Sequence, residues 1–225
     1  MTFTFENTFI SRRLPVYLLL DTSGSMAGAP LQAVEQGVKL VCEELMNTPQ
    51  AVETAWISVI TFGSQASQIV VLTELMQFTP PHLQAGGSTA MGAALHMLGE
   101  AIDQEVSANT SEQKGDYKPL IFLFTDGAPT DDWEAGLSAL RSRTQKKPVT
   151  LVGLGCGAGA KISTLQQICD VTLKLADATP DAIQEFFKWV SQSIKTASIT
   201  VPGSGGGQGP GANLPPLSPN IQIPI

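Results

Sequence analysis

Cysteine is scarce in this sequence, and its scarcity excludes the two architectures that paired cysteines build. The 225 residues contain three cysteines, at Cys42, Cys156 and Cys169. An odd number with no C-x-x-C spacing fits neither a disulfide framework nor a zinc ribbon. We therefore expect free thiols, as in a protein of a reducing compartment.

Long apolar runs are absent as well. No stretch approaches the roughly 18 apolar residues that a membrane span needs. The first residues, MTFTFENTFISRR, lack the charged segment and the long apolar segment of a signal peptide. The sequence thus predicts a cytoplasmic protein without a membrane span.

Basic residues are fewer than acidic ones. Lysine and arginine number 13 against 20 aspartates and glutamates, which gives a net charge of −7. No basic stripe is visible, so nucleic acid is not an expected partner. The G-x-x-x-x-G-K-[ST] loop of nucleotide-binding proteins and the G-x-S-x-G turn of serine hydrolases are also missing.

Apolar runs of strand length alternate with segments of helical spacing. Such continuous short runs are typical of strands buried on both faces of a sheet. The predicted strands are 14–20, 56–62, 68–74, 120–124, 149–154 and 171–175, the last at an edge. The predicted helices are 31–45, 91–106, 133–140, 162–168 and 183–194.

This order of elements predicts an α/β fold. The second and third strands are joined by only a short turn, which requires an antiparallel hairpin. The other strands are separated by helices, as in parallel sheets. We expect a doubly wound, mostly parallel six-stranded sheet with one antiparallel edge strand and helices on both faces.

The composition divides the chain into three parts. Residues 1–13 form an N-terminal extension, residues 14–198 the α/β domain, and residues 199–225 a tail. Eleven of the eighteen residues in 202–219 are glycine or proline, which predicts a flexible tail. Its last residues, NIQIPI, have the composition of an extended segment that docks on a sheet edge or on a partner.

Three distant stretches place oxygen-bearing side chains after a strand or before a helix. They are DTSGS at 21–25, GGST at 86–89 and TDG at 125–127. In an open α/β sheet, ligands bind at the carboxyl ends of the strands, where these segments should converge. The candidate metal ligands are Asp21, Ser23, Ser25, Thr89 and Asp126.

Two carboxylates and three hydroxyls favour a hard cation over zinc. We expect Mg²⁺, with Mn²⁺ or Ca²⁺ as alternatives. The two carboxylates carry two negative charges, which only neutralise a divalent ion. The site is therefore expected to lack one strong ligand. A carboxylate from an Asp or Glu of a protein partner would fill that position.

Simpler interpretations of the acidic residues remain open. Asp21, taken alone, fits a helix N-cap. Asp131 and Asp132 precede Trp133 and are expected to cap the helix that begins there, and Trp133 is expected to anchor that helix. The polar loop 107–118 should lie at the end of the sheet away from the metal.

The three oxygen-bearing stretches resemble the metal-ion-dependent adhesion site of von Willebrand factor type A domains. That pattern is D-x-S-x-S, a distant Thr and a distant Asp in a TDG context, and the resemblance covers about residues 14–196. It implies a protein-interaction module in which the five candidate residues hold the metal.

Longer stretches resemble a narrower group. RRLPVYLLLDTSGSM, LTEL and KPLIFLFTDGAPTDDW are similar to the TerY-type proteins of bacterial tellurium-resistance and chemical-stress clusters. This resemblance implies a cytoplasmic regulatory scaffold beside a protein kinase and a protein phosphatase. The chain lacks the C-terminal cysteine module that some members of that group carry.

The alternative function is a Mg²⁺-dependent phosphoryl-transfer or hydrolase domain. Receiver and dehalogenase folds also place aspartates and a Ser or Thr at strand ends. They need a second Asp beside the nucleophile, or a Lys after a later strand, to stabilise the transferring group. Thr22 and Ser23 stand where that Asp would be, and Lys161 lies beyond the strand end. The sequence therefore predicts no catalytic residues.

Overall fold

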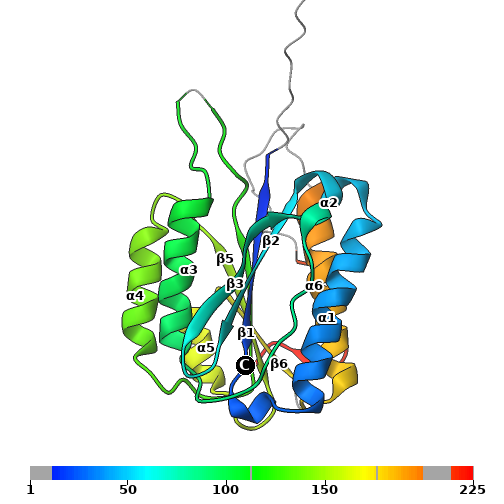
Figure 1. Ribbon diagram of the computed structural model, residues 1–225, viewed down its shortest axis with the longest axis vertical. Helices are drawn as coiled ribbons and strands as arrows, with labels where there is room; N and C mark the ends of the chain where they lie inside the picture. The colour runs from blue at the N-terminus through cyan, green and yellow to red at the C-terminus, as the bar shows by residue number, and fades with distance from the viewer. Residues whose placement is uncertain (1–11, 112, 176, 200–213, 225) are drawn as a thin grey trace, which may run out of the picture.

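The computed structural model describes residues 12–111, 113–175, 177–199 and 214–224. They form one seven-stranded sheet between two layers of helices (Figure 1). The strands are β1 (Leu14–Asp21), β2 (Ala55–Phe62), β3 (Ala66–Glu74), β4 (Leu120–Thr125), β5 (Thr150–Cys156), β6 (Val171–Leu175) and β7 (Ile221–Gln222). Their order across the sheet is β3-β2-β1-β4-β5-β6-β7.

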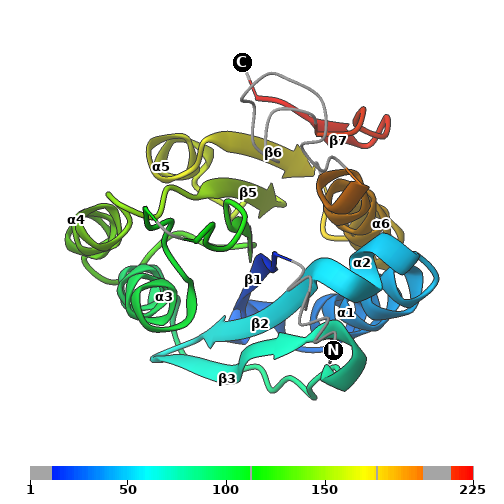
Figure 2. The ribbon, with the colours of Figure 1, turned by 90° about the horizontal axis from the view of Figure 1, so that it is seen from above.

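Helices cover both faces of the sheet. The α-helices are α1 (Ala29–Met46), α2 (Pro49–Thr54), α3 (Met91–Glu105), α4 (Trp133–Arg143), α5 (Ile162–Ile168) and α6 (Pro180–Ile199). Two short 3-10 helices are η1 (Gly24–Met26) and η2 (Leu75–Gln77). α1, α2 and α6 lie on one side, and α3, α4 and α5 lie on the other (Figures 1 and 2). The doubly wound prediction is confirmed, and none of the described helices is long and apolar enough to cross a membrane.

The central strand β1 is buried along its whole length because it contributes to two hydrophobic cores. Val16, Leu18 and Leu20 pack into the core beneath α1 and α6. Tyr17 and Leu19 pack into the core beneath α3 and α4. Alternate side chains of a strand point to opposite faces, so a strand buried on both sides needs the continuous apolar run seen in the sequence.

The sheet has one strand more than the six predicted. β3 pairs antiparallel with β2, as expected from the short turn. β6 is not an edge strand, because β7 pairs antiparallel with it through Leu175↔Ile221 and Lys174↔Gln222. The pairing of Ile221 and Gln222 confirms the sheet-edge docking that was one placement expected for NIQIPI, although the tail as a whole was predicted to be flexible. Ile221 is only 3% exposed, and the burial of such apolar residues outweighs the Gly/Pro composition around them. Residues 200–213 lie outside the described residues.

Two helices of one layer approach each other unusually closely. A Cβ added to Gly136 of α4 would lie 2.2 Å from the carbonyl oxygen of Gly92 in α3. A Cβ added to Gly92 would lie 2.4 Å from the carbonyl oxygen of Asp132. Only glycine permits this backbone contact, which fixes the start of α4 and the loop before it against α3.

Candidate metal centre

Parallel pairing of β1 with β4 brings the first two oxygen-bearing segments together. Leu20 lies opposite Phe124, so Asp21 and Thr125 follow side by side at the carboxyl edge. Thr125 Oγ1 donates a hydrogen bond of 2.5 Å to Asp21 Oδ2. The backbone N–H of Ser23 donates one of 2.8 Å to Asp21 Oδ1. Both oxygens of the Asp21 carboxylate are therefore fixed in place.

Two serines connect Asp21 to Asp126. The hydroxyl oxygens of Ser23 and Ser25 lie 3.0 Å apart, and Ser25 Oγ donates a hydrogen bond of 2.8 Å to Asp126 Oδ1. The spacing of two residues between the serines turns both hydroxyls towards the same point.

The loop before α3 brings in the threonine. The N–H of Gly24 donates to the carbonyl oxygen of Gly87 over 3.0 Å, and Gly87 adopts a φ of +78°, which favours glycine. A Cβ built on Gly127 would lie 3.2 Å from Thr89 Oγ1 and 4.0 Å from Asp21 Oδ2. Thr89 therefore faces the same space as Asp21, and the structure brings all five candidate ligands together.

Burial and charge make this cluster unusual. The side chains of Asp21, Ser23 and Thr89 are buried, whereas Ser25 is exposed and Asp126 partly so. Burial raises the pKa of Asp21, and the charge of Asp126 adds to the rise, while hydrogen bonds from Ser23 and Thr125 oppose it. None of the ion pairs among the described residues includes Asp21 or Asp126. A buried carboxylate without a cationic partner is costly.

The donor set fits a hard divalent cation. Among the described residues, no three His, Cys, Asp or Glu side chains are placed so that they could hold a metal ion together. The cluster instead offers two carboxylates and three hydroxyls, which are oxygen ligands of the kind that Mg²⁺ and Ca²⁺ take. A cation here would offset both the burial of Asp21 and its repulsion from Asp126.

Asp131 and Asp132, predicted to cap the same helix, cap two different ones. Asp132 Oδ1 accepts from Ala135 N and caps α4, as expected. The Asp131 carboxylate instead accepts from the N–H groups of Gly92 and Ala93 in the first turn of α3, each over 2.8 Å. The prediction for Asp131 was wrong, because α3 packs against this loop from a distant part of the chain.

Two further threonines support the site and were not among the candidate ligands. Thr130 Oγ1 accepts from the N–H of Thr89 over 3.1 Å, and Thr130 N donates to the carbonyl oxygen of Thr89 over 2.9 Å. Thr125 holds Asp21, as described above. The position of Thr125 beside Asp126 was a signal for its role, whereas nothing in the spacing indicated Thr130.

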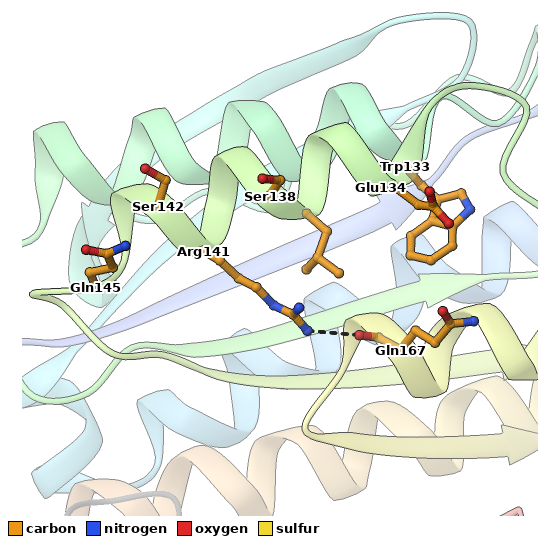
Figure 3. Close-up of a pocket in the computed structure, with 8 residues that line it drawn as sticks. Trp133, Glu134, Ser138, Arg141, Ser142, Gln145 and Gln167 are labelled. Atoms are coloured by element: carbon orange, nitrogen blue, oxygen red, sulfur yellow. Dashed lines mark hydrogen bonds between the residues drawn. The ribbon is translucent and has the colours of Figure 1, made fainter.

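A pocket lies between α4 and α5, and none of the candidate metal ligands lines it (Figure 3). Trp133 lies at one end of the pocket, and Arg141 Nη2 donates to the carbonyl oxygen of Gln167 across it over 3.1 Å. Glu134 and Arg141 give its walls mixed charge. The described residues of the loop, 107–111 and 113–118, lie at the opposite end of the sheet from η1, as predicted (Figure 1).

A doubly wound α/β sheet with an oxygen-lined cluster at its carboxyl edge defines a class of domain. The von Willebrand factor type A domain profile matches residues 16–189. The chain belongs to that family. Its domains are generally protein-interaction and adhesion modules.

Solved structures share the fold at low sequence identity. A von Willebrand factor type A protein from Catenulispora acidiphila is 18% identical, with a TM-score of 0.62, over 82% of this chain and 43% of that one. The pilus adhesin SpaC from Lactobacillus rhamnosus GG is 18% identical, with a TM-score of 0.63, over 82% and 31%. Proximal thread matrix protein 1 from the mussel byssus is 18% identical, with a TM-score of 0.58, over 81% and 48%. The chain thus spans less than half of each of these proteins. No curated protein sequence matches it.

The three cysteines are free thiols, as predicted, and two of them, Cys156 and Cys169, should be nearly inert because burial raises their pKa values strongly. Burial raises the pKa of Cys156 to about 12, and the charges of Asp126 and Asp177 contribute. A raised thiol pKa keeps the neutral form, so only about one molecule in ten thousand carries the thiolate at pH 8. Iodoacetamide should therefore label Cys156 far more slowly than half-buried Cys42, as measured by peptide mass spectrometry. Equal rates in the native protein would contradict this prediction, and denaturation should remove the difference.

Proposed function

We propose that this chain is a non-catalytic protein-interaction module whose binding depends on a divalent cation. The observation that carries the proposal is the buried carboxylate of Asp21. It is held by the hydroxyl of Thr125, its pKa is raised by burial and by the charge of Asp126, and it takes part in none of the ion pairs of the described residues. Mg²⁺ would be held by Asp21, Ser23, Ser25, Thr89 and Asp126, with Mn²⁺ or Ca²⁺ as alternatives. The bound cation would supply a positive charge that attracts a carboxylate.

The open side of the cluster indicates how a partner would approach. Ser25 and Asp126 are the more exposed members, and loops 22–28, 85–89 and 126–132 surround them. Because the protein contributes two negative charges, an Asp or Glu of the partner supplies the remaining strong ligand. The surrounding loops then determine which partner binds.

The likeness of the sequence to TerY-type proteins supports a narrower role. We propose a cytoplasmic regulatory scaffold in tellurium or chemical-stress resistance, with a protein kinase and a protein phosphatase as partners. The stretches RRLPVYLLLDTSGSM and KPLIFLFTDGAPTDDW carry this part of the proposal.

Partner capture from the native cytoplasm should depend on both the metal and the cluster. Capture in Mg²⁺ should be lost in EDTA, recover with excess Mg²⁺, and fall at least about tenfold for Thr89→Val, which removes only a hydroxyl. Lys114→Ala, in the loop at the other end of the sheet, should capture the partner normally. A partner that is retained in EDTA and by Thr89→Val would place the interface elsewhere.

The second candidate function is phosphoryl transfer, because Asp21 and Asp126 lie at strand ends, as the aspartates of phosphoryl-transfer domains do. Incubation with 4-nitrophenyl phosphate and Mg²⁺ separates the two functions. Sustained turnover that Asp21→Ala abolishes would favour the enzyme. We expect no turnover, because Lys161 lies just before α5 and not at the end of β5, where a lysine would stabilise the transferring group.

A further inference from the structure

The C-terminal segment, residues 214–224, lies along the edge of β6 and the side of α6. Figure 2 shows β7 beside β6 at the rim of the sheet, next to α6. Contacts of three kinds hold this segment, each to a different part of it. Together these contacts resemble those by which proteins bind extended peptides.

The proline-rich part is held by a tryptophan. Trp189 Nε1 donates a hydrogen bond of 3.0 Å to the carbonyl oxygen of Pro215. The Trp189 ring is fixed by stacking on Phe186, with ring centroids 6.2 Å apart. Leu214 and Leu217, on either side of the proline pair, pack against the core. Aromatic side chains commonly recognise proline-rich segments in this way.

A tight turn follows and is recognised by one carboxylate. The N–H of Ile221 donates to the carbonyl oxygen of Ser218 over 3.0 Å and closes the turn, with Pro219 at its second position. Glu185 Oε2 accepts from Ser218 Oγ over 3.1 Å and from Asn220 Nδ2 over 2.9 Å. A single charged acceptor on α6 therefore binds two side chains of the turn.

The last part adds a strand to the sheet. Ile221 pairs with Leu175 and is 3% exposed, whereas Ile223 is 64% exposed. β6 pairs with β5 along its whole length, from Val171 to Leu175. The segment therefore attaches to a sheet whose other strands are already paired, as in β-strand addition.

We propose that the surface formed by the β6 edge and α6, where Leu175, Glu185 and Trp189 contact the segment, is a peptide-binding site. Its ligand class is an extended Leu-Pro-Pro-Leu segment followed by a turn and a buried isoleucine. The chain's own residues 214–224 occupy this surface as an intramolecular ligand. A tethered ligand has an effective concentration on the order of millimolar, so any outside peptide of this class must compete with the chain's own segment. The site is independent of the metal.

The test is a titration of the full-length chain in EDTA with a fluorescently labelled peptide of residues 214–225, followed by anisotropy. Ile221→Asp in the chain puts a charge at a buried position of the segment and should release it. The peptide should then bind this variant about tenfold tighter than the wild type, or more. Ile223→Asp is the matched control, since Ile223 is exposed, and it should bind the peptide no better than the wild type.

A milder variant keeps the test valid if Ile221→Asp does not fold. Ser218→Ala combined with Asn220→Ala removes the hydrogen bonds to Glu185 without burying a charge, and should also tighten peptide binding about tenfold. A peptide that carries Ile221→Asp should bind none of these proteins. The proposal is overturned if the parent peptide binds the wild type and the released variants equally, or binds none of them. It is also overturned if the altered peptide binds as well as the parent.

Discussion

Mg²⁺ should raise the melting temperature of the wild-type chain, and Asp21→Asn should abolish that rise. A ligand that binds only the folded state stabilises it by about 2.7 kcal/mol at one hundred times its Kd. For a domain of this size that corresponds to about 5 to 10 °C. Asparagine keeps the size of the side chain and removes its charge. Differential scanning calorimetry with and without Mg²⁺ measures the effect.

The metal-free state provides a second readout of the same substitution. Asp21→Asn removes the repulsion from Asp126 and the burial of a charge, so without metal the variant should be at least as stable as the wild type. Asp132→Asn is the control, because it removes an exposed charge nearby and asparagine caps helices as well as aspartate does. It should keep the full Mg²⁺ shift. Equal shifts in the wild type and Asp21→Asn would mean that the metal binds elsewhere.

Gly136→Ala should destabilise the fold, although alanine ordinarily stabilises a helix relative to glycine by about 0.5–1 kcal/mol. The new Cβ would lie 2.2 Å from the carbonyl oxygen of Gly92 and 2.7 Å from its Cα. Backbone atoms cannot rotate away as a side chain does, so α4 must move from α3. We expect a net loss of about 1–3 kcal/mol, measured from the denaturant midpoint at unchanged slope.

The movement of α4 should also shift the metal ligands, because the loop that carries Asp126 and Asp131 leads directly into α4. Mg²⁺ affinity, measured by calorimetric titration, should therefore weaken in Gly136→Ala. Ser138→Ala, on the exposed side of α4, should change stability by no more than about 0.5 kcal/mol and leave the affinity intact. A midpoint for Gly136→Ala at or above that of the wild type would refute the close-contact interpretation.

The arrangement of the candidate ligands could be predicted because the sequence shows where the two strands that carry the aspartates begin and end. Continuous apolar runs identified β1 and β4 as central strands, and an oxygen-bearing residue follows each run directly. Parallel strands bring their carboxyl ends to one edge, so Asp21 and Asp126 had to lie close together. The spacing of two residues from Asp21 to Ser23 and from Ser23 to Ser25 then predicted that both serines face the same point as Asp21.

The features that were missed depend on contacts between distant parts of the chain. Asp131 caps α3 from 38 to 39 residues away, and neighbouring residues give no sign of which helix lies within reach. Docking of the terminal NIQIPI on a sheet edge was among the expectations, but the sequence did not indicate which edge, because β7 pairs through two residues only. Its position depends on Trp189 and Glu185, which α6 presents to a segment that follows much later.

The described sheet has a long border along β3 and a short one at the two-residue strand β7. From Ala66 to Thr73 the sequence has no charged residue and no proline, while Ile69 and Val71 are 41% and 60% exposed. Natural sheets usually protect such a border with lysine, proline or an irregularity. Here the protection is the shifted register between Ile57 and Ile60 against β3. Because this irregularity is the one protection described and Ile69 and Val71 stay exposed, self-association at high concentration should begin along β3.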